Sequence, residues 1–322
     1  MQGSEDLGLS LSHAIMEVKT ESVEDVSQAL ENQGYISSTE ISTIVYLAIK
    51  MQRPIMVEGP AGVGKTELAK SLSKALKLEL IQLQCYEGLD ETKAIYEWEY
   101  AKQLLYTQIL KEKISEVIGS ADDLNESIKK LVKLEDAFFS DHFLLPRPLL
   151  KAIRSEKRTV LLIDEVDKSD PEFEAYLLEI LSTNEITIPE LGTQTAKSIP
   201  VVFLTSNNVR DLSDALKRRC LNLYIDFPSQ ELEVKIVETK FPQASKKLVQ
   251  RLVQAIHEIR KLEIKKKPSI SETLDWASAL LTLQVEDITP DDLQKTLGII
   301  SKYKTDMDQI MEAADKVLRE VS

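Results

Sequence analysis

The chain has 322 residues, 43% of them hydrophobic, which allows about two globular domains. Its 53 acidic and 40 basic side chains give a formal net charge of −13, a field that repels phosphate backbones and disfavours nucleic-acid binding. No apolar run approaches the ~20 residues that a membrane-spanning helix needs, and the acidic start does not resemble a secretion signal, so we expect a cytoplasmic protein without a membrane span.

The predicted elements begin after a polar, acidic segment at 1–22 that has no sustained period and is expected to be a flexible N-terminal arm. From Ser38 onward, apolar residues recur at helical spacing, and Arg53-Pro54 ends that helix. Helical segments separate most of the later apolar runs, so we expect an α/β fold with a parallel five-stranded sheet. The predicted strands lie at 55–57, 80–83, 159–163, 201–205 and 221–225.

Three further segments complete the expected organisation. An excess of about 70 residues separates the second and third predicted strands, so we expect a helical insertion at about 102–140. Alternating apolar and polar residues around Gly192 predict a β-hairpin at about 185–200. After Pro228 the strand signals cease, and capping patterns such as Thr289-Pro290-Asp291-Asp292 predict helices. We therefore expect an α/β domain at 23–228 and an all-α lid domain at 229–322.

The segment GPAGVGKT at 59–66 matches the pattern G-x-x-x-x-G-K-[ST] and lies between the first predicted strand and an amphipathic helix. In that setting glycines let successive backbone N–H groups point inward, and the helix N-terminus adds positive potential. Lys65 can reach the outer phosphates of a nucleotide, and the Thr66 hydroxyl can bind Mg²⁺. The predicted nucleotide-binding residues are Gly59, Pro60, Ala61, Gly62, Val63, Gly64, Lys65, Thr66 and Glu67.

Polar residues follow the third and fourth predicted strands, at the sheet edge where ligands of open α/β sheets bind. Asp164 can bind Mg²⁺ together with Thr66, while Glu165 can act as a general base on the attacking water. Asn207 can orient that water and contact the γ-phosphate; the alternative is that it only caps a turn. This pattern predicts hydrolysis of a nucleoside triphosphate.

Arg218 and Arg219 precede the fifth predicted strand. A guanidinium there can spread the charge of a transferring phosphoryl group, in cis or from a neighbouring subunit, or can simply be solvated at a helix end. No Asn is followed by Lys, so the N-K-x-D motif that reads guanine is absent and ATP is the expected nucleotide. A small-molecule kinase would not need the paired acids, the hairpin or the helical C-terminal part.

Cysteines and histidines give no sign of a further metal site. Cys85 and Cys220 are the only cysteines, which excludes a disulfide framework or a four-cysteine zinc site and agrees with a reducing compartment. The three histidines lie far apart in the sequence. We expect two ordinary buried thiols and structural or surface histidines.

The combination of GPAGVGKT, LLIDEVDKSDPEFEAYLLEIL, ITIPELGT, FLTSNN, DALKRRC and PSISETLDWASAL resembles the MoxR branch of the AAA+ ATPases. Within that branch the chain is most similar to the CoxD-like proteins associated with carbon monoxide dehydrogenase maturation. The resemblance covers about residues 33–304, and its most specific segments are QCYEGLDETKAIYEW and SETLDWA. It implies an AAA+ core followed by a helical lid.

The resemblance also implies roles for residues. Asp164 and Glu165 would form the Walker B pair, and Asn207 would be sensor 1. Arg219, with Arg218 as the second choice, would be an arginine finger that acts on an adjacent subunit. The residues placed near the adenine are Tyr35 and Ile36.

One position departs from the pattern of many AAA+ lids. Where they carry a sensor 2 arginine in a Ser-x-Arg pattern, this chain has Ser269-Ile270-Ser271. Ser269 and Glu272 instead predict a capping box for the helix that follows. The nearby Arg260, Lys261 and lysines 265–267 could replace that arginine electrostatically, but a solvated basic face is the favoured expectation.

By the same resemblance we expect a Mg²⁺-dependent ATPase that forms a homo-oligomeric ring of six subunits. It would act as a chaperone, with a von Willebrand factor A-type partner, in the maturation of a metalloenzyme client such as a molybdenum enzyme. Two alternatives stay open: a nucleotide-gated protein-binding module with negligible turnover, and a nucleic-acid-stimulated translocase.

Overall fold

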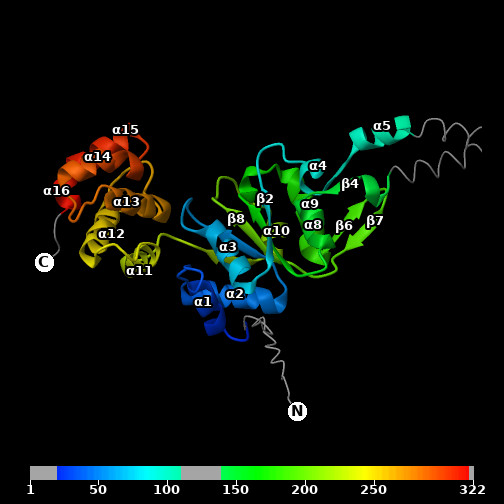
Figure 1. Cartoon of the computed structure of the whole chain (residues 1–322), viewed down its shortest axis with the longest axis horizontal. Coiled ribbons are helices and arrows are strands. Elements are labelled where there is room, and N and C mark those ends of the chain that lie inside the picture. Colours follow the sequence, from blue (N-terminus) through cyan, green and yellow to red (C-terminus); the bar gives the residue numbers. More distant parts are fainter. Residues whose placement is uncertain (1–19, 110–138, 319–322) are drawn as a thin grey trace, which may run out of the picture.

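The computed structural model of the chain describes residues 20–109 and 139–318 (Figure 1). The predicted N-terminal arm falls mostly on 1–19 and the predicted insertion mostly on 110–138, outside the described residues. No helix within the described ranges is both long and apolar enough to cross a bilayer.

A five-stranded sheet forms the centre of the N-terminal part, and its neighbouring strands are all parallel. The prediction of a parallel five-stranded sheet in an α/β fold is confirmed. The register pairs Glu58 with Ser206 and Gln84 with Asp164, so the carboxyl ends of four strands lie at the same edge. Across the sheet the strands run β2 (Glu79–Gln84), β5 (Thr159–Asp164), β8 (Val201–Ser206), β1 (Ile55–Glu58) and β9 (Leu221–Tyr224).

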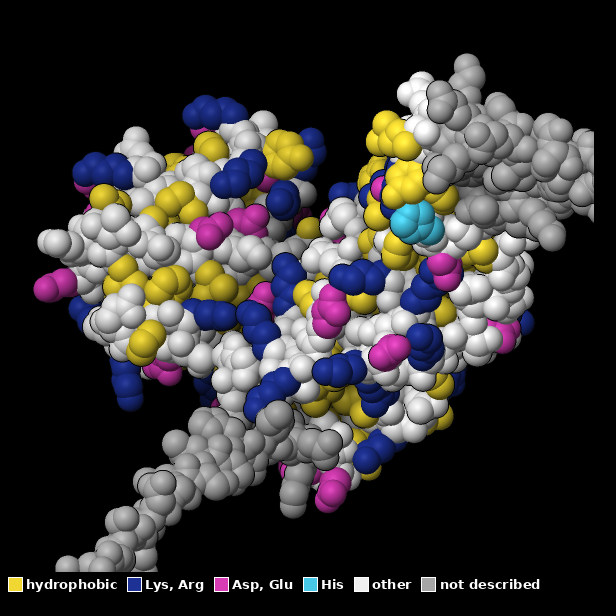
Figure 2. Space-filling view, turned by 45° about the vertical axis from the view of Figure 1, so that its right-hand side comes forward, with side chains coloured by type: hydrophobic (Ala, Val, Ile, Leu, Met, Phe, Trp, Pro, Cys, Tyr) yellow, Lys and Arg dark blue, Asp and Glu magenta, His cyan; other side chains and the backbone are white. Residues whose placement is uncertain are grey.

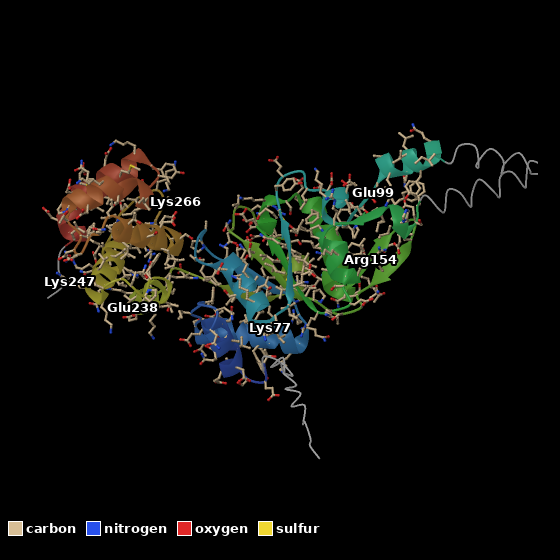
Figure 3. All side chains as sticks on the ribbon, in the orientation of Figure 1. Lys77, Glu99, Arg154, Glu238, Lys247 and Lys266 are labelled. Carbon is tan, nitrogen blue, oxygen red and sulfur yellow. The ribbon has the colours of Figure 1, made fainter. Side chains whose placement is uncertain are left out.

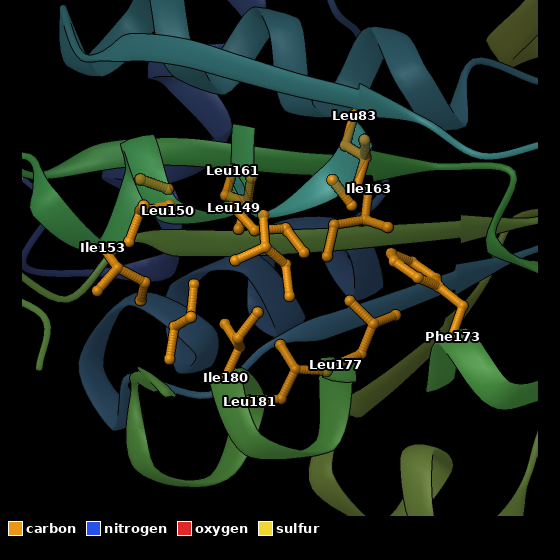
Figure 4. Packing of buried hydrophobic residues seen from close by; sticks show 14 of the residues in the cluster. Leu83, Leu149, Leu150, Ile153, Leu161, Ile163, Phe173, Leu177, Ile180 and Leu181 are labelled. Atoms are coloured by element: carbon orange, nitrogen blue, oxygen red, sulfur yellow. The ribbon is translucent and has the colours of Figure 1, made fainter. Parts of the chain in front are cut away.

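Helices cover both faces of this sheet. Successive residues of β5 alternate between them, because side chains of a strand point to opposite faces: Val160 packs on one side and Leu161 on the other. Figure 4 shows the packing of Leu161 and Ile163 against helices of the second face. The first face is covered by α1 (Val23–Glu31), α2 (Thr39–Met51) and α3 (Lys65–Leu76), the second by α8 (Pro148–Arg154), α9 (Pro171–Thr183) and α10 (Asp214–Arg219).

Two small antiparallel sheets flank this core. A hairpin of β6 (Glu185–Ile188) and β7 (Gly192–Thr195) lies where the sequence predicts one, and β3 (Tyr96–Trp98) pairs with β4 (Leu144–Pro146). Helix α5 (Tyr100–Ile109) follows β3 and exposes several large apolar side chains at its surface (Figure 2). Shorter elements are α4 (Glu91–Ala94) and the 3₁₀ turns Asp141–Phe143 and Val166–Lys168.

The C-terminal region is helical and has a core of its own around Trp276. The indole Nε1 of Trp276 donates to Thr296 Oγ1 at 2.8 Å, so a polar atom of the core is satisfied. Exposed lysines such as Lys247 and Lys266 lie on the outside of this bundle (Figure 3). Its helices are α11 (Gln230–Lys240), α12 (Lys246–Arg260), α13 (Ile270–Thr282), α14 (Pro290–Ile300), α15 (Lys304–Glu312) and α16 (Ala314–Val317).

Arg260 is buried in this region, so the expectation that it belongs to a solvated basic face is wrong. Its guanidinium donates to both carboxylate oxygens of Glu233, at 2.6 and 2.9 Å, and its Nε donates to Pro268 O at 2.8 Å. It also lies over the ring of Phe227, 5.0 Å from the centroid. A buried guanidinium needs such partners because an unpaired charge in the interior is strongly unfavourable.

Candidate functional site

The loop 59–64 joins β1 to α3, and its conformation requires glycine. Gly59, Gly62 and Gly64 have φ values of 144°, 79° and 96°, which side-chain-bearing residues rarely adopt. A Cβ on Gly59 would lie 2.0 Å from Ile225 O, and one on Gly62 would lie 2.2 Å from Ser269 Oγ. The loop therefore lies against the chain after β9 and against the start of α13.

The Lys65 ammonium is buried and enclosed by oxygen acceptors. It donates to Gly59 O at 2.7 Å, to Pro60 O at 2.7 Å and to Asn207 Oδ1 at 2.8 Å. Three acceptors match its three N–H donors. Burial lowers the pKa of Lys65, and the carboxylates of Asp167, Asp164 and Glu165 oppose that shift. The structure thus brings the loop and the end of β8 together.

Asp164 meets Thr66 at the end of β5. The Thr66 hydroxyl donates to Asp164 Oδ1 at 2.9 Å, and Thr205 Oγ1 donates to the same oxygen at 2.6 Å. Gln82 Nε2 donates to Asp164 Oδ2 at 3.3 Å. A hydroxyl and a carboxylate in contact are oxygen donors of the kind that Mg²⁺ binds, so the predicted pair fits this ion.

Glu165 has its backbone in the left-handed region, with φ 56° and ψ 49°. A non-glycine residue in that region is strained by about 1–3 kcal/mol, and such residues concentrate at functional sites. The carboxylate accepts from Asn207 Nδ2 at 3.0 Å through Oε1, and from Gln84 Nε2 at 2.8 Å and Lys168 Nζ at 2.6 Å through Oε2. Asn207 therefore bridges Lys65 and Glu165.

The sequence analysis did not predict several residues that contact this cluster. Gln82 and Gln84 are polar at alternate positions of β2, so both lie on one face of the strand beside β5. This alternation in the sequence could have indicated that they belong to the site. Asp167 is buried, and its Oδ2 accepts from the backbone N–H of Asn207 at 3.0 Å and of Val209 at 2.8 Å. It thereby fixes the turn that presents the Asn207 amide.

A cavity of about 550 Å³ opens beside the loop. Tyr35 and Ile36 line it, and a Cβ on Gly64 would lie 3.7 Å from the Tyr35 ring. Burial raises the pKa of the Tyr35 hydroxyl, which stays neutral. The volume lies within the ~300–1,000 Å³ typical of small-molecule sites. Its other walls include Ile41, Val63, Glu67, Tyr224, Phe227, Leu232, Ile270 and Leu274.

The start of α13 contacts the loop without an arginine. The backbone N–H and the hydroxyl of Ser271 donate to Gly62 O at 3.3 and 3.2 Å. Ser269 and Glu272 form the predicted capping box. The C-terminal helices therefore reach the loop through an amide and a hydroxyl at the position where a sensor 2 arginine is absent.

The structure does not bring Arg218 and Arg219 to this chain's own loop. They end α10 just before Leu221, which pairs with Ile55 at the amino end of β1, whereas the loop follows the carboxyl end. Arg219 donates to Ser182 Oγ and, at 2.9 Å, to Ala215 O, while the Arg218 side chain is exposed. Both arginines thus lie at the edge of the sheet opposite the glycine loop of their own chain.

The cysteines and described histidines lie in ordinary surroundings. Cys85 and Cys220 are buried, and burial raises the pKa of each thiol to about 12. His257 contacts Glu233 at 2.8 Å, and His142 packs edge-on against Phe143. Across 20–109 and 139–318, no group of three or more His, Cys, Asp or Glu side chains is placed to hold a metal ion.

A family model described as "AAA domain (dynein-related subfamily)" matches residues 54–220, just over half of the chain. The matched range runs from the residue before β1 to the residue before β9. It therefore contains the loop and the ends of β5 and β8.

Individual proteins match the chain at low sequence identity. The chain is similar to the "Gas vesicle ATPase GvpN" of Haloferax mediterranei, with 27% identity over 245 residues that cover 71% of this chain and 64% of that protein. It therefore spans less than two thirds of that relative. An "Uncharacterized protein" of Staphylococcus epidermidis is 22% identical over 268 residues, covering 81% of this chain and 88% of that protein.

Among solved structures, the Thermotoga maritima RuvB Holliday junction branch migration motor is similar with a TM-score of 0.43 and 14% sequence identity. The match covers 84% of this chain and 68% of that one. A similarity at this level bears on neither the activity nor the partners of the chain.

We predict that Gly62→Ala destabilises the protein more than Gly192→Ala does. The two glycines have similar φ values, 79° and 73°, but a Cβ meets Ser269 only at position 62 and meets nothing within 4 Å at position 192. Positive φ alone costs roughly 1–2 kcal/mol, and the overlap with Ser269 adds about 1–3 kcal/mol. Urea unfolding measures both free energies; equal losses would contradict the close contact between the loop and α13.

Proposed function

The chain belongs to the family of AAA domains of the dynein-related subfamily. We therefore propose that it binds ATP with Mg²⁺ and hydrolyses the bond between the β- and γ-phosphates. One observation carries the proposal: Lys65, Thr66, Asp164, Glu165 and Asn207 meet in one hydrogen-bonded cluster, in which Thr205 links Asp164 to the backbone of Glu165. An ammonium, a hydroxyl, paired carboxylates and an amide are the groups that phosphoryl transfer to water requires.

In this proposal each side chain has a task that its position supports. Lys65 turns from the loop carbonyls to the outer phosphates, and Asn207 orients the attacking water. Glu165 accepts a proton from that water through its carboxylate. Thr66 and Asp164 would hold Mg²⁺, which supplies positive charge beside the phosphates. Tyr35 and Ile36 contact the adenine in the cavity beside the loop.

We expect Glu165→Gln to bind ATP as the wild type does and to hydrolyse it ~10²-fold or more slowly, because the amide cannot take the proton. Lys65→Ala should lose ATP binding, since the loop then lacks the ammonium that faces the phosphates. Calorimetry in magnesium buffer, with GTP as the competing nucleotide, and phosphate release measure the two effects. Lys74→Ala, an exposed lysine of the same helix, is the matched control. No heat of ATP association with the wild type, or equal turnover of the wild type and Glu165→Gln, would overturn the proposal.

We further propose that the chain forms a homo-oligomeric ring of six subunits in which Arg219, with Arg218 as the second candidate, acts on the ATP of a neighbour. The support is their position, since both end α10 away from the loop of their own chain. From the end of α10, a guanidinium can reach a nucleotide site only in a neighbouring subunit.

Mixing two inactive variants tests action in trans. Arg219→Ala keeps its loop but lacks the finger, and Lys65→Ala lacks the ammonium but keeps the finger. We expect each alone to hydrolyse ATP slowly and the mixture to recover activity, because a Lys65→Ala neighbour supplies the guanidinium. The same mixture with Arg218→Ala identifies which arginine acts. Activity of the mixture equal to the sum of its parts would refute a finger in trans.

We propose, last, that the chain is a MoxR-branch, CoxD-like chaperone of the cytoplasm. It would work with a von Willebrand factor A-type partner on a metalloenzyme client, such as a molybdenum enzyme of the carbon monoxide dehydrogenase kind. The support is sequence resemblance, because fold alone does not define function. Its two most specific segments adjoin the site: 84–98 begins at Gln84, which contacts Glu165, and 271–277 begins at Ser271, which contacts Gly62.

The slow Glu165→Gln variant should remain ATP-bound and retain its partners. We expect affinity purification with this variant to recover a von Willebrand factor A-type protein and a metalloenzyme subunit, and to recover neither with Lys65→Ala. Mass spectrometry identifies the recovered proteins. Recovery of nucleic acid, together with salt-sensitive stimulation of ATP hydrolysis by DNA, would instead support a translocase.

A further inference from the structure

Arg53 reaches the end of the helix that carries the two candidate finger arginines. Its guanidinium donates to three successive backbone carbonyls: Nη2 to Arg218 O at 2.9 Å and to Cys220 O at 3.3 Å, and Nε to Arg219 O at 3.4 Å. The last carbonyls of a helix lack partners within that helix, and α10 has only six residues. A single side chain thus supplies donors to the whole end of α10.

The backbone of Arg53 has little freedom of its own. Gln52 ends α2 in the left-handed region with φ 53°, and the N–H of Arg53 donates to Ala48 O at 3.2 Å. Pro54 follows, and contact with a proline ring restricts the preceding residue to extended conformations. The guanidinium therefore extends from a point that the end of α2 and the start of β1 both fix.

The two sides of the α10 end are held in different ways. Leu221 N donates to Pro54 O at 2.8 Å, which joins the chain after α10 to the start of β1. The Arg53 side chain holds the three residues before that point. Its bonds take up backbone carbonyls, so the side chains of Arg218 and Arg219 remain able to contact another subunit.

We propose that Arg53 is a positioning residue for the arginine finger: it fixes the end of α10 so that Arg219, or Arg218, reaches the ATP of a neighbouring subunit. The inference rests on the proposed function, and in particular on a finger that acts in trans. A guanidinium stabilises a transferring phosphoryl group only where charge develops, and a misplacement of about 1 Å can lower a rate ~10²-fold. Without Arg53 the three carbonyls turn to water, and the end of α10 loses its fixed position.

Arginine suits this task through its shape as well as its charge. Its planar guanidinium carries five N–H donors in a rigid fork, whereas lysine carries one ammonium on a flexible stem. A positive charge near the end of a helix is favourable with either residue. Arg53→Lys therefore keeps the charge and loses the fork, and Arg53→Met loses both.

The chain offers a matched control in Arg158. Its Nε donates to Ile199 O at 3.2 Å and its Nη2 to Ile49 O at 3.3 Å, so this guanidinium also binds carbonyls of two separate segments. One of them is the last part of α2, the helix that leads to Arg53, and neither belongs to α10. Arg158→Met reports the effect of removing such a bridge without touching the finger.

Calorimetry and steady-state kinetics give the first test. We expect Arg53→Met to bind ATP with the wild-type Kd, because the loop of its own site is unchanged, and to lower kcat about 10-fold to 10²-fold. Arg53→Lys should lie between Arg53→Met and the wild type, and Arg158→Met should match the wild type. A wild-type kcat of Arg53→Met would overturn the proposal. Weaker ATP binding would also overturn it, because Arg53 would then support its own loop.

Mixed rings decide whether the defect lies in the finger. Arg53→Met keeps an intact site and offers a misplaced finger, while Arg219→Ala keeps its site and offers none. We expect Arg53→Met to recover activity with Lys65→Ala, whose α10 is unchanged, and to recover none with Arg219→Ala. Arg218→Ala takes the place of Arg219→Ala if it is the inactive variant. Recovery with the finger variant, or no recovery with Lys65→Ala, would overturn the proposal.

Assembly and folding are measured on the same samples. We expect light scattering with a non-hydrolysable ATP analogue to give the wild-type mass for Arg53→Met and Arg53→Lys, and circular dichroism to give the wild-type helix content. The mixing experiment is repeated with Arg53→Lys. Loss of assembly by either folded variant would overturn the proposal, since Arg53 would then serve the interface itself.

The controls separate this proposal from the proposed function. Absence of ATP binding by the wild type rejects the ATPase. Binding without recovery when Lys65→Ala is mixed with Arg219→Ala or with Arg218→Ala rejects a finger in trans. Recovery in one of those mixtures, together with none for Arg53→Met and Lys65→Ala, rejects only the role of Arg53.

Discussion

The parallel register of β1, β5 and β8 is the constraint on which the site depends. It places the ends of these strands at one edge, so that residues distant in sequence, such as Lys65 and Asn207, come within 2.8 Å. Parallel strands are joined by crossovers on the faces of the sheet, which leaves the carboxyl edge open for loops. The contacts that join the loop to the ends of β5 and β8 follow from that arrangement.

The two central charged groups at this edge are satisfied by their neighbours. The Lys65 ammonium has three acceptors, and the Glu165 carboxylate has three donors. Such mutual pairing is what keeps buried or half-buried charges stable in the interior of a protein. It also means that nucleotide binding must exchange existing hydrogen bonds for new ones, so the occupied and empty states differ in their side-chain contacts.

The helical C-terminal region takes part in the same site. Gly62 lies so close to the start of α13 that only a glycine fits, and Ser271 donates twice to its carbonyl. Behind this contact, the buried Arg260 binds Glu233 and the carbonyl of Pro268, next to the residue that begins the capping box. A basic residue that looks like part of a solvated face in sequence is in this way part of the support for α13.

The amino-acid sequence by itself determined the five strands, the glycine loop, the paired acids and the capping boxes, because these depend on local periodicity and on motifs of fixed spacing. It did not reveal that Gln84 contacts Glu165, that Asp167 anchors Asn207, or that Arg260 is buried. Those contacts join elements whose relative positions the local pattern does not encode. Only the tertiary structure decided them, because the register of the sheet and the docking of α13 bring together side chains that are separated by many residues along the chain.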